Sequence, residues 1–203
     1  MSENKNEKLS LSQSIYEWVE TFCFALLGVV IVFTFICRFV TVVGPSMEKT
    51  FYEGDRLIIS NLFYTPKTGD VVVLQDVLQQ ENGLQGPIIK RVIATEGETV
   101  DINNETWEIT VTHRDGTVEV LKEDYANRVY TDKNGERVLK NMTPPYVSKI
   151  KYPHVVEEGC VFVLGDNRTN SHDSRAMGDV DKRKILGKVY LRLFPLNKIA
   201  FFG

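Results

Sequence analysis

Residues 87–94 have the sequence PIIKRVIA, a short run rich in β-branched residues with two adjacent cations in its middle. β-Branched residues favour extended backbone, so the run predicts a β-strand. Side chains alternate between the two faces of a strand, which places Ile88, Lys90 and Val92 on one face. If that face is buried, loss of hydration lowers the pKa of Lys90 and makes a neutral amine available as a base. The alternation by itself favours the other arrangement, an edge strand that exposes Lys90 to solvent.

Similar short runs recur between residues 69 and 193, separated by turn-forming pairs such as Asn82-Gly83 and Asp115-Gly116. No long segment in this part of the chain has helical periodicity. The expected fold class is therefore mainly β, with an all-β, partly barrel-like domain. Residues of about 101–157 are polar and rich in turns, which suggests a β-rich subdomain inserted between two core strands. The other expected strands are 69–75, 99–103, 106–112, 117–121, 160–164 and 186–193.

A continuous apolar segment precedes the β-rich part. Residues 21–37 are seventeen uncharged, mostly apolar residues between Glu20 and Arg38, which is close to the length that crosses a bilayer. One alternative is a buried core helix, which is rarely apolar on every face in a small protein. Another is a cleaved secretory signal, for which no Ala-x-Ala pattern follows the segment. We expect a retained single-pass transmembrane helix at 18–43, after a tail at 1–17 and before a domain at 44–203.

The composition excludes several classes of protein. With 43% hydrophobic and 25% charged residues, the chain is globular rather than disordered. Its formal net charge of -3 gives no electrostatic reason to bind nucleic acid. The three cysteines do not suggest a disulfide framework, and no grouping of His, Cys or carboxylates has metal-ligand spacing, so we expect neither a metal nor another cofactor. Basic residues flank the apolar segment on both sides, so charge leaves the orientation in the membrane open.

Four short stretches contain residue types that catalysis uses: 44–47 (GPSM), 54–56 (GDR), 89–92 (IKRV) and 165–175 (GDNRTNSHDSR). Ser46 follows a Gly-Pro turn that exposes its side chain, but a serine hydroxyl is a weak nucleophile until a base removes its proton. The run 165–175 is dense in charged and amide side chains directly after an apolar strand. It fits an ordinary surface loop, and also a polar scaffold that orients a buried lysine and its serine. Spacing alone does not choose between these.

In this order behind an apolar segment, the four stretches resemble the conserved motifs of bacterial type I signal peptidases, and the pattern Gly-Asp-Asn-Arg-x-x-Ser-x-Asp-Ser-Arg is complete at 165–175. The tail at 187–199 resembles the Gram-positive branch of that family. The resemblance implies a membrane-bound serine endopeptidase that cleaves signal peptides of exported preproteins after small residues (Ala-x-Ala) through an acyl-enzyme. It also implies a catalytic domain on the extracytoplasmic side of the cell membrane. Membrane lipid and the translocation machinery are expected as further partners, and nucleic acid is not.

The resemblance assigns roles to individual residues. Ser46 is the expected nucleophile and Lys90 its general base. Ser171 is expected to hydrogen-bond the Lys90 amine and orient it. Asp173 and Arg175 are expected to form a buried ion pair that supports the site.

The oxyanion and substrate sites follow from the resemblance less completely. The Ser46 N–H is the expected oxyanion donor, but some relatives add a serine hydroxyl at the position where this chain has Gly44. Two further departures are Lys49 within the usual Ser-Met-x-Pro-Thr, and 94–98 (ATEGE) in place of Gly-x-Pro-Gly-Asp. The residues expected to line shallow pockets for small substrate side chains are Val40, Val42, Met47 and Ile88.

Lys49 also supports a rival interpretation, because Ser46-x-x-Lys49 followed by 67–69 (KTG) resembles motifs of penicillin-binding proteins and β-lactamases. In such an acyltransferase Lys49 is the base. That motif needs a helix to bring residues i and i+3 together, but Pro45 and the sequence after Lys49 suit a helix start poorly, and there is no Ser-Asp-Asn element. A third interpretation is a non-enzymatic, membrane-tethered β domain, which leaves the polar run 165–175 without a purpose.

Overall fold

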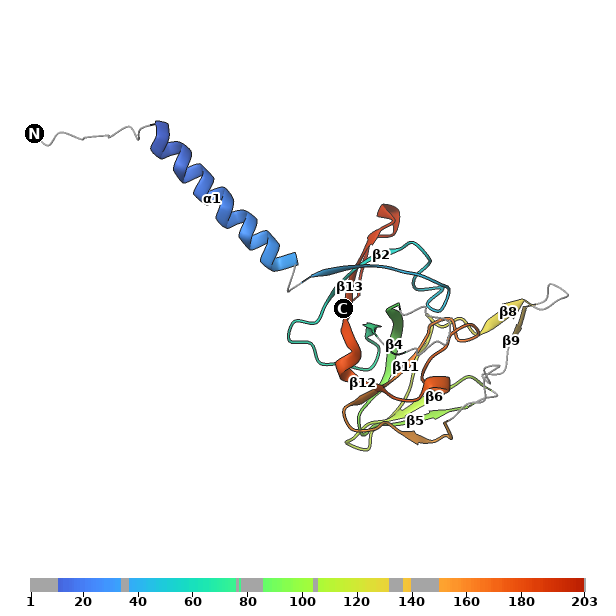
Figure 1. Ribbon diagram of the computed structural model, residues 1–203. Coiled ribbons are helices and arrows are strands. Elements are labelled where there is room, and N and C mark those ends of the chain that lie inside the picture. The colour runs from blue at the N-terminus through green and yellow to red at the C-terminus, as the bar shows by residue number, and fades with distance from the viewer. Residues whose placement is uncertain are drawn as a thin grey trace, which may run out of the picture. The chain divides into compact units, whose positions relative to one another are not determined.

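The structure, a computed structural model, describes residues 11–33, 37–75, 77, 86–103, 106–131, 137–139 and 150–202. The chain divides into two compact units, Met1–Arg38 and Phe39–Gly203. The first contains one long helix, and the second is built mainly of strands (Figure 1). The predicted fold class, mainly β behind one N-terminal apolar helix, is confirmed.

The helix α1 spans Leu11–Ile31. Within it, Gln13–Ile31 is long and apolar enough to cross a membrane by its length and composition. None of this stretch is buried by the described chain, and Trp18 is 76% exposed. The helix starts earlier than the predicted 18–43, and it also ends earlier, because residues 38–41 already form a strand.

The main sheet curves into a half-barrel. Its strands are β1 Arg38–Thr41, β2 Arg56–Ser60, β3 Val71–Leu74, β4 Ile88–Thr95, β11 Cys160–Leu164, β12 Val180–Asp181, β13 Ile185–Phe194 and β14 Ala200–Phe201. Among the described strands the order is β1-β2-β13-β3-β4-β11-β12, with β14 paired to β13. Register shifts interrupt the pairings of β13 with β2 and β3 and of β11 with β4. Such irregularities increase the bend of a sheet, which suits the predicted partly barrel-like shape.

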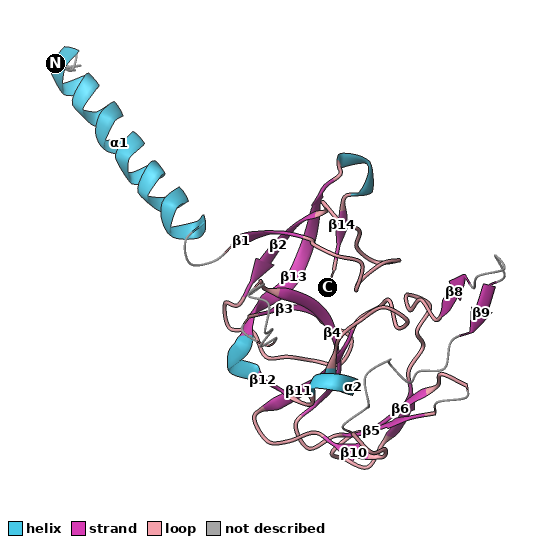
Figure 2. Cartoon of the chain, turned by 45° about the vertical axis from the view of Figure 1, so that its right-hand side comes forward, coloured by secondary structure: helices cyan, strands magenta, loops and turns pink. Residues whose placement is uncertain are grey.

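A second sheet lies in sequence between β4 and β11. It consists of β5 Thr99–Ile102, β6 Ile109–Thr112, β7 Val118–Val120 and β10 His154–Val155, in the order β10-β5-β6-β7. Between β7 and β10 in the chain, β8 Val129–Thr131 and β9 Arg137–Leu139 form a separate hairpin. Because β4 and β11 pair with each other, these strands are an insertion between two core strands, as predicted. Figure 2 shows β5, β6 and β10 together at one end of the unit, away from β1 and β2.

The core consists of three apolar clusters, which cover both faces of the central strands. In β3, Val71 and Val73 pack into one apolar cluster while Val72 and Leu74 pack into another. A third cluster, around Trp107, joins β4 and β11 to the insertion. Hydrophobic burial of this kind is the main source of stability in a fold without bridges, and the three cysteines Cys23, Cys37 and Cys160 are indeed free.

All expected strands are present, but some ends differ and several short strands were not predicted. The run 106–112 becomes a strand only from Ile109, because Trp107 takes a positive φ of 63° in the preceding turn. Strand β2 was missed although its residues alternate between exposed and buried. The short helical elements among the described residues include α2 Ser174–Met177 and the 3₁₀ turns Lys182–Lys184 and Leu196–Lys198.

Candidate active site

Strand β4 carries Lys90 into the interior of the second unit. It pairs with β3 on one side and with β11 on the other. Lys90 is 2% exposed and the neighbouring Arg91 is 9% exposed. An edge strand that exposes Lys90 to solvent is therefore excluded.

Ser46 lies in the turn that follows β1, residues 44–50, which we call the nucleophile turn. Gly44 begins it with a φ of +80°, a left-handed conformation that glycine adopts at little cost. Lys90 Nζ lies 2.9 Å from Ser46 Oγ and 3.0 Å from the carbonyl oxygen of Ile89. Two residues far apart in the sequence are thus in hydrogen-bond contact, with an amine next to a hydroxyl.

The surroundings of Lys90 favour its neutral form. Burial lowers the pKa of Lys90 from 10.5 to about 8, because the ammonium ion loses its hydration. The carboxylates of Asp173 and Asp166 oppose this shift, and the Arg175 guanidinium adds to it. Desolvation is the largest effect, so the site provides an amine that can accept a proton near neutral pH.

Asp173 and Arg175 form a buried ion pair beside this amine. Arg175 Nε lies 2.8 Å from Asp173 Oδ1, and the two residues are 3% and 1% exposed. Burial alone would raise the pKa of Asp173, but the Arg175 guanidinium, the Gly165 N–H and the Ser171 hydroxyl together hold that pKa below its usual range. Asp173 Oδ2 also accepts the N–H of Gly165 at 3.0 Å. The hydrogen bond between Gly165 and Asp173 therefore ties the two ends of residues 165–173, the polar loop, to each other.

The polar loop holds the nucleophile turn directly. The Asn167 N–H donates to the Ser46 carbonyl at 3.0 Å. The Asn167 side-chain amide donates to the Pro45 carbonyl at 3.0 Å and to the Glu48 carboxylate at 3.1 Å. The run 165–175 is therefore a scaffold of the site and not an ordinary surface loop.

Ser171 does not make the expected hydrogen bond to Lys90. Its Oγ is buried and forms no hydrogen bond of good geometry with the described residues, but it lies close enough to the Asp173 carboxylate to help lower the pKa of that group. It lies against Gly165, where an added Cβ would be 2.1 Å from Ser171 Oγ and 2.6 Å from the Ser46 carbonyl oxygen. The Lys90 amine instead contacts Ser46 and Ile89. Ser171 and the nucleophile turn both pack on the bare backbone of Gly165, which explains why a glycine stands there.

Three of the four expected substrate-contacting residues lie together. Val42 and Met47 are buried in one apolar cluster, and Val40 packs against it half-buried. Ile88 packs against a different cluster, and its neighbour Ile89 takes part in the first. This difference follows from strand alternation, since adjacent residues of β4 point to opposite faces.

Two buried ion pairs of the site were not predicted. Arg91 contacts both carboxylate oxygens of Asp166, at 2.8 and 2.6 Å. Arg168 contacts both carboxylate oxygens of Glu123, and neither side chain is exposed. The many charged residues of the polar loop indicate that they have partners. Their spacing does not identify these partners, because Arg91 is 75 positions from Asp166 and Glu123 is 45 positions from Arg168.

Lys49 is engaged elsewhere than at Ser46. Its Nζ donates to the carbonyls of Asp124 and Ala126, at 3.2 and 3.1 Å. Lys49 also has a positive φ of 84°, so residues 46–49 form a turn rather than the helix that a Ser-x-x-Lys motif requires. The geometry does not support Lys49 as a base.

The backbone around Ser46 leaves donors available for a developing negative charge. The N–H groups of Ser46 and Gly44 form no hydrogen bond with the described part of the chain. Free backbone N–H groups next to a nucleophile are the usual components of an oxyanion site. Gly44 contributes no side chain, so any second donor here comes from backbone.

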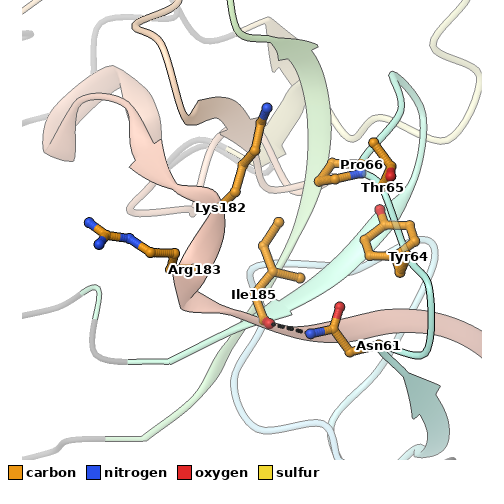
Figure 3. Close-up of a pocket in the computed structure, with 7 residues that line it drawn as sticks. All are labelled: Asn61, Tyr64, Thr65, Pro66, Lys182, Arg183 and Ile185. Carbon is orange, nitrogen blue, oxygen red and sulfur yellow. Dashed lines mark hydrogen bonds between the residues drawn. The ribbon is translucent and has the colours of Figure 1, made fainter.

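The residues that the structure describes offer no metal site. Among them, no three His, Cys, Asp or Glu side chains gather in a way that could bind a metal ion. A pocket elsewhere on the surface is lined by neither Ser46 nor Lys90 (Figure 3). Two of its lining residues are joined by a hydrogen bond from the Asn61 side-chain amide to the Ile185 carbonyl. The residues that line it are Asn61, Tyr64, Thr65, Pro66, Lys182, Arg183 and Ile185.

Known proteins similar to this chain are signal peptidases. Residues 15–194 match the family described as signal peptidase, peptidase S26. A probable signal peptidase I-1 of Synechocystis sp. is 34% identical over 190 residues, which cover 88% of this chain and 84% of the relative. A signal peptidase I P of Bacillus subtilis subsp. natto is 32% identical over 190 residues, 92% of each chain. A crystal structure of a signal peptidase I from Enterococcus faecalis V583 is 25% identical, with a TM-score of 0.42 over 62% of this chain and 97% of that one.

Proposed function

This chain belongs to the signal peptidase family, peptidase S26, and we propose that it cleaves its substrates through a catalytic dyad of Ser46 and Lys90. The protein is a membrane-anchored serine peptidase that removes signal peptides from preproteins. The observation that carries the proposed dyad is the 2.9 Å contact between Lys90 Nζ and Ser46 Oγ, made by a lysine that is 2% exposed.

In the proposed reaction, the neutral Lys90 amine takes the proton of Ser46 Oγ as this oxygen attacks the scissile carbonyl carbon. The N–H groups of Ser46 and Gly44 stabilise the negative charge on the carbonyl oxygen. The Lys90 ammonium then gives its proton to the leaving amine as the C–N bond breaks and the acyl-enzyme forms. Water attacks the ester in the second half, with Lys90 again as base, and Ser46 is regenerated.

The lowered pKa of Lys90 is what makes this chemistry feasible near neutral pH. At a pKa of about 8, roughly one Lys90 in ten is neutral at pH 7, against about one in 3,000 at the ordinary value of 10.5. The nearby ion pair of Asp173 and Arg175 has little net charge, so it orders the polar loop without returning Lys90 to its ordinary pKa.

We propose that the substrate binds as an extended strand along β1. This strand ends the main sheet, so one of its edges is unpaired among the described strands, and such an edge can accept the backbone of a peptide. The half-buried Val40 lies on this strand and packs against the buried Val42 and Met47, so the proposed subsite has an apolar backing. An apolar subsite of this kind suits the small residues of an Ala-x-Ala cleavage site. A contact between Ile88 and the substrate stays a prediction.

The proposed orientation places residues 1–17 in the cytoplasm and the domain at 44–203 outside it, where exported preproteins emerge. Lipid beside the domain and the translocation machinery are the proposed further partners. Digestion of sealed right-side-out vesicles by an added protease tests the orientation: the domain should be cut without detergent. Protection of the domain would place it on the cytoplasmic side.

The decisive test of the dyad compares three alanine variants on a preprotein with an Ala-x-Ala site. We expect Ser46→Ala and Lys90→Ala each to abolish cleavage, with a loss of at least about 10³-fold in kcat. Lys49→Ala should retain cleavage. Full activity of Lys90→Ala would overturn the proposed dyad, and loss of all activity in Lys49→Ala alone would revive the rival base.

A further inference from the structure

We propose that residues 123–128, which we call the strap, position the nucleophile turn for catalysis, with Glu123 as a positioning residue and Lys49 as the tether of the strap. The strap lies between β7 and β8 in the insertion, a region for which the motifs of the sequence suggest no role. This inference rests on the proposed chemistry of Ser46 and Lys90.

The first contact of the strap is a buried ion pair. Glu123 binds Arg168 through both carboxylate oxygens, and both side chains are fully shielded from solvent. Arg128 and the Tyr125 hydroxyl also donate to this carboxylate, at 2.7 and 3.2 Å. Arg168 Nε in turn donates to the Gly165 carbonyl at 3.0 Å. Glu123 therefore fixes the start of the polar loop through Arg168.

The second contact is made by backbone on either side of Asn167. The Asn127 N–H donates to the Asp166 carbonyl at 2.7 Å, and the Arg168 N–H donates to the Asn127 carbonyl at 2.9 Å. Asn127 and Asn167 thus form a parallel β-bridge. Asn167 is the residue that holds the Ser46 carbonyl, so the strap is one link away from the nucleophile.

The third contact of the strap is with Arg91 of β4, which forms the ion pair with Asp166. The Tyr125 ring lies 3.9 Å from the Arg91 guanidinium, which itself binds Asp166. A cation over an aromatic face is attracted to it, more strongly where water is excluded. Burial raises the pKa of Tyr125 to about 12, so the ring stays uncharged at the pH values at which the enzyme is assayed.

Lys49 ties the nucleophile turn to the strap from the other side. Its amine donates to the carbonyls of Asp124 and Ala126. A proline at this position would have no amine and could not adopt the φ of 84° that Lys49 has. The nucleophile turn is therefore held by the strap both directly, through Lys49, and indirectly, through Asn167.

The test measures kcat and KM of the full chain in detergent on a preprotein, from pH 6 to pH 10. The variants are Glu123→Gln and Lys49→Met, which remove the charge or the amine and keep the side-chain shape. Their matched controls are Glu108→Gln and Lys122→Met, two exposed residues whose side chains bond to none of the described residues. Urea unfolding of each variant shows how much of it is folded.

A loosened strap should let Ser46 move away from Lys90 and let water reach the amine. From the usual effect of losing one hydrogen bond, we expect kcat to fall about 3–10-fold in Lys49→Met and about 10–100-fold in Glu123→Gln, with KM within about twofold of wild type. The pH at which kcat is half-maximal should rise from about 8 towards 10.5. Both control variants should behave as wild type.

A role in stability alone would lower the folded fraction without moving this pH. The proposal is overturned if Lys49→Met has the wild-type kcat and pH profile, or if the rate of Glu123→Gln falls only with its folded fraction. Should Glu123→Gln not fold, Lys49→Met decides alone, because its amine lies at the surface. An inactive Lys90→Ala with unaffected strap variants would refute the strap and leave the dyad standing.

Discussion

Replacing Lys90 by methionine should abolish activity and yet stabilise the fold at neutral pH. The reason is the burial of an amine whose pKa is about 8 in the folded chain and 10.5 as a free side chain. The folded chain binds fewer protons than the unfolded chain between these values, so the stability of the wild type rises with pH across this window. Below pH 8 the cost of burying Lys90 is fully present, and above pH 10.5 it is absent.

The magnitude follows from the shift. At pH 7 the cost is about 3 kcal/mol, and at pH 10 it is about 1 kcal/mol. Lys90→Met removes this cost but also loses the contacts of Nζ with Ser46 and Ile89, which contribute about 1–2 kcal/mol together. The variant should therefore be more stable than wild type by about 1–2 kcal/mol at pH 7 and about equal or less stable at pH 10.

The assay is urea unfolding of the full chain in detergent at pH 7, 8, 9 and 10, followed by the fluorescence of the buried Trp107. The quantity of interest is the free energy of unfolding of the variant minus that of wild type. It should fall by about 2 kcal/mol from pH 7 to pH 10, whatever the lost contacts contribute. Lys122→Met, which replaces an exposed lysine, serves as the control and should show no such dependence. A difference for Lys90→Met that stays constant with pH would refute the burial of a shifted amine.

Three further predictions concern the same site. The rate of cleavage should rise about tenfold per pH unit up to about pH 8 and then level off, because Lys90 must lose its proton to act as base; a flat profile from pH 5 to 9, measured with the preprotein, would contradict this role. Gly165→Ala should lower kcat by more than about 10-fold, since its Cβ would collide with Ser171 Oγ at 2.1 Å. Steady-state kinetics equal to wild type would contradict this and show that the polar loop can shift without loss of activity. Asp173→Asn should destabilise the fold by about 3–5 kcal/mol, because it leaves the buried Arg175 charge without its partner; urea unfolding measures the loss, and a loss under about 1 kcal/mol would mean that water or another group compensates.

The alternation of apolar residues was enough to predict the fold class and most long strands. β-Branched runs such as 87–94 and 160–164 form strands wherever they are buried, because their side chains fit a pleated sheet. Strand β1 was not predicted because its apolar residues continue the segment assigned to the helix at 18–43, and β12 has only two residues. The continuous run of apolar residues in the first unit likewise predicts its helix. Where that helix ends could not be predicted, because it depends on the pairing of β1 with the main sheet.

The candidate site divides in the same way. The residue types, their order and their resemblance to a family pointed to Ser46, Lys90, Asp173 and Arg175. Periodicity gave the wrong environment for Lys90, because exposure depends on which strands flank β4, and β11 joins it only after the whole insertion. Which lysine reaches the serine was also decided by the fold, since Lys49 is nearer in sequence but turns to the strap.

By itself, then, the sequence determined the kinds of groups present and the local conformations that they prefer, because both depend on residues close together in the chain. The tertiary structure alone decided that Lys90 is buried, that Glu123 pairs with Arg168, and that Ser171 faces Gly165 rather than the amine. The physical reason is that desolvation and ion pairing depend on distance and solvent exclusion in space. Spacing along the chain does not encode those distances when the partners are separated by 44 or 45 residues.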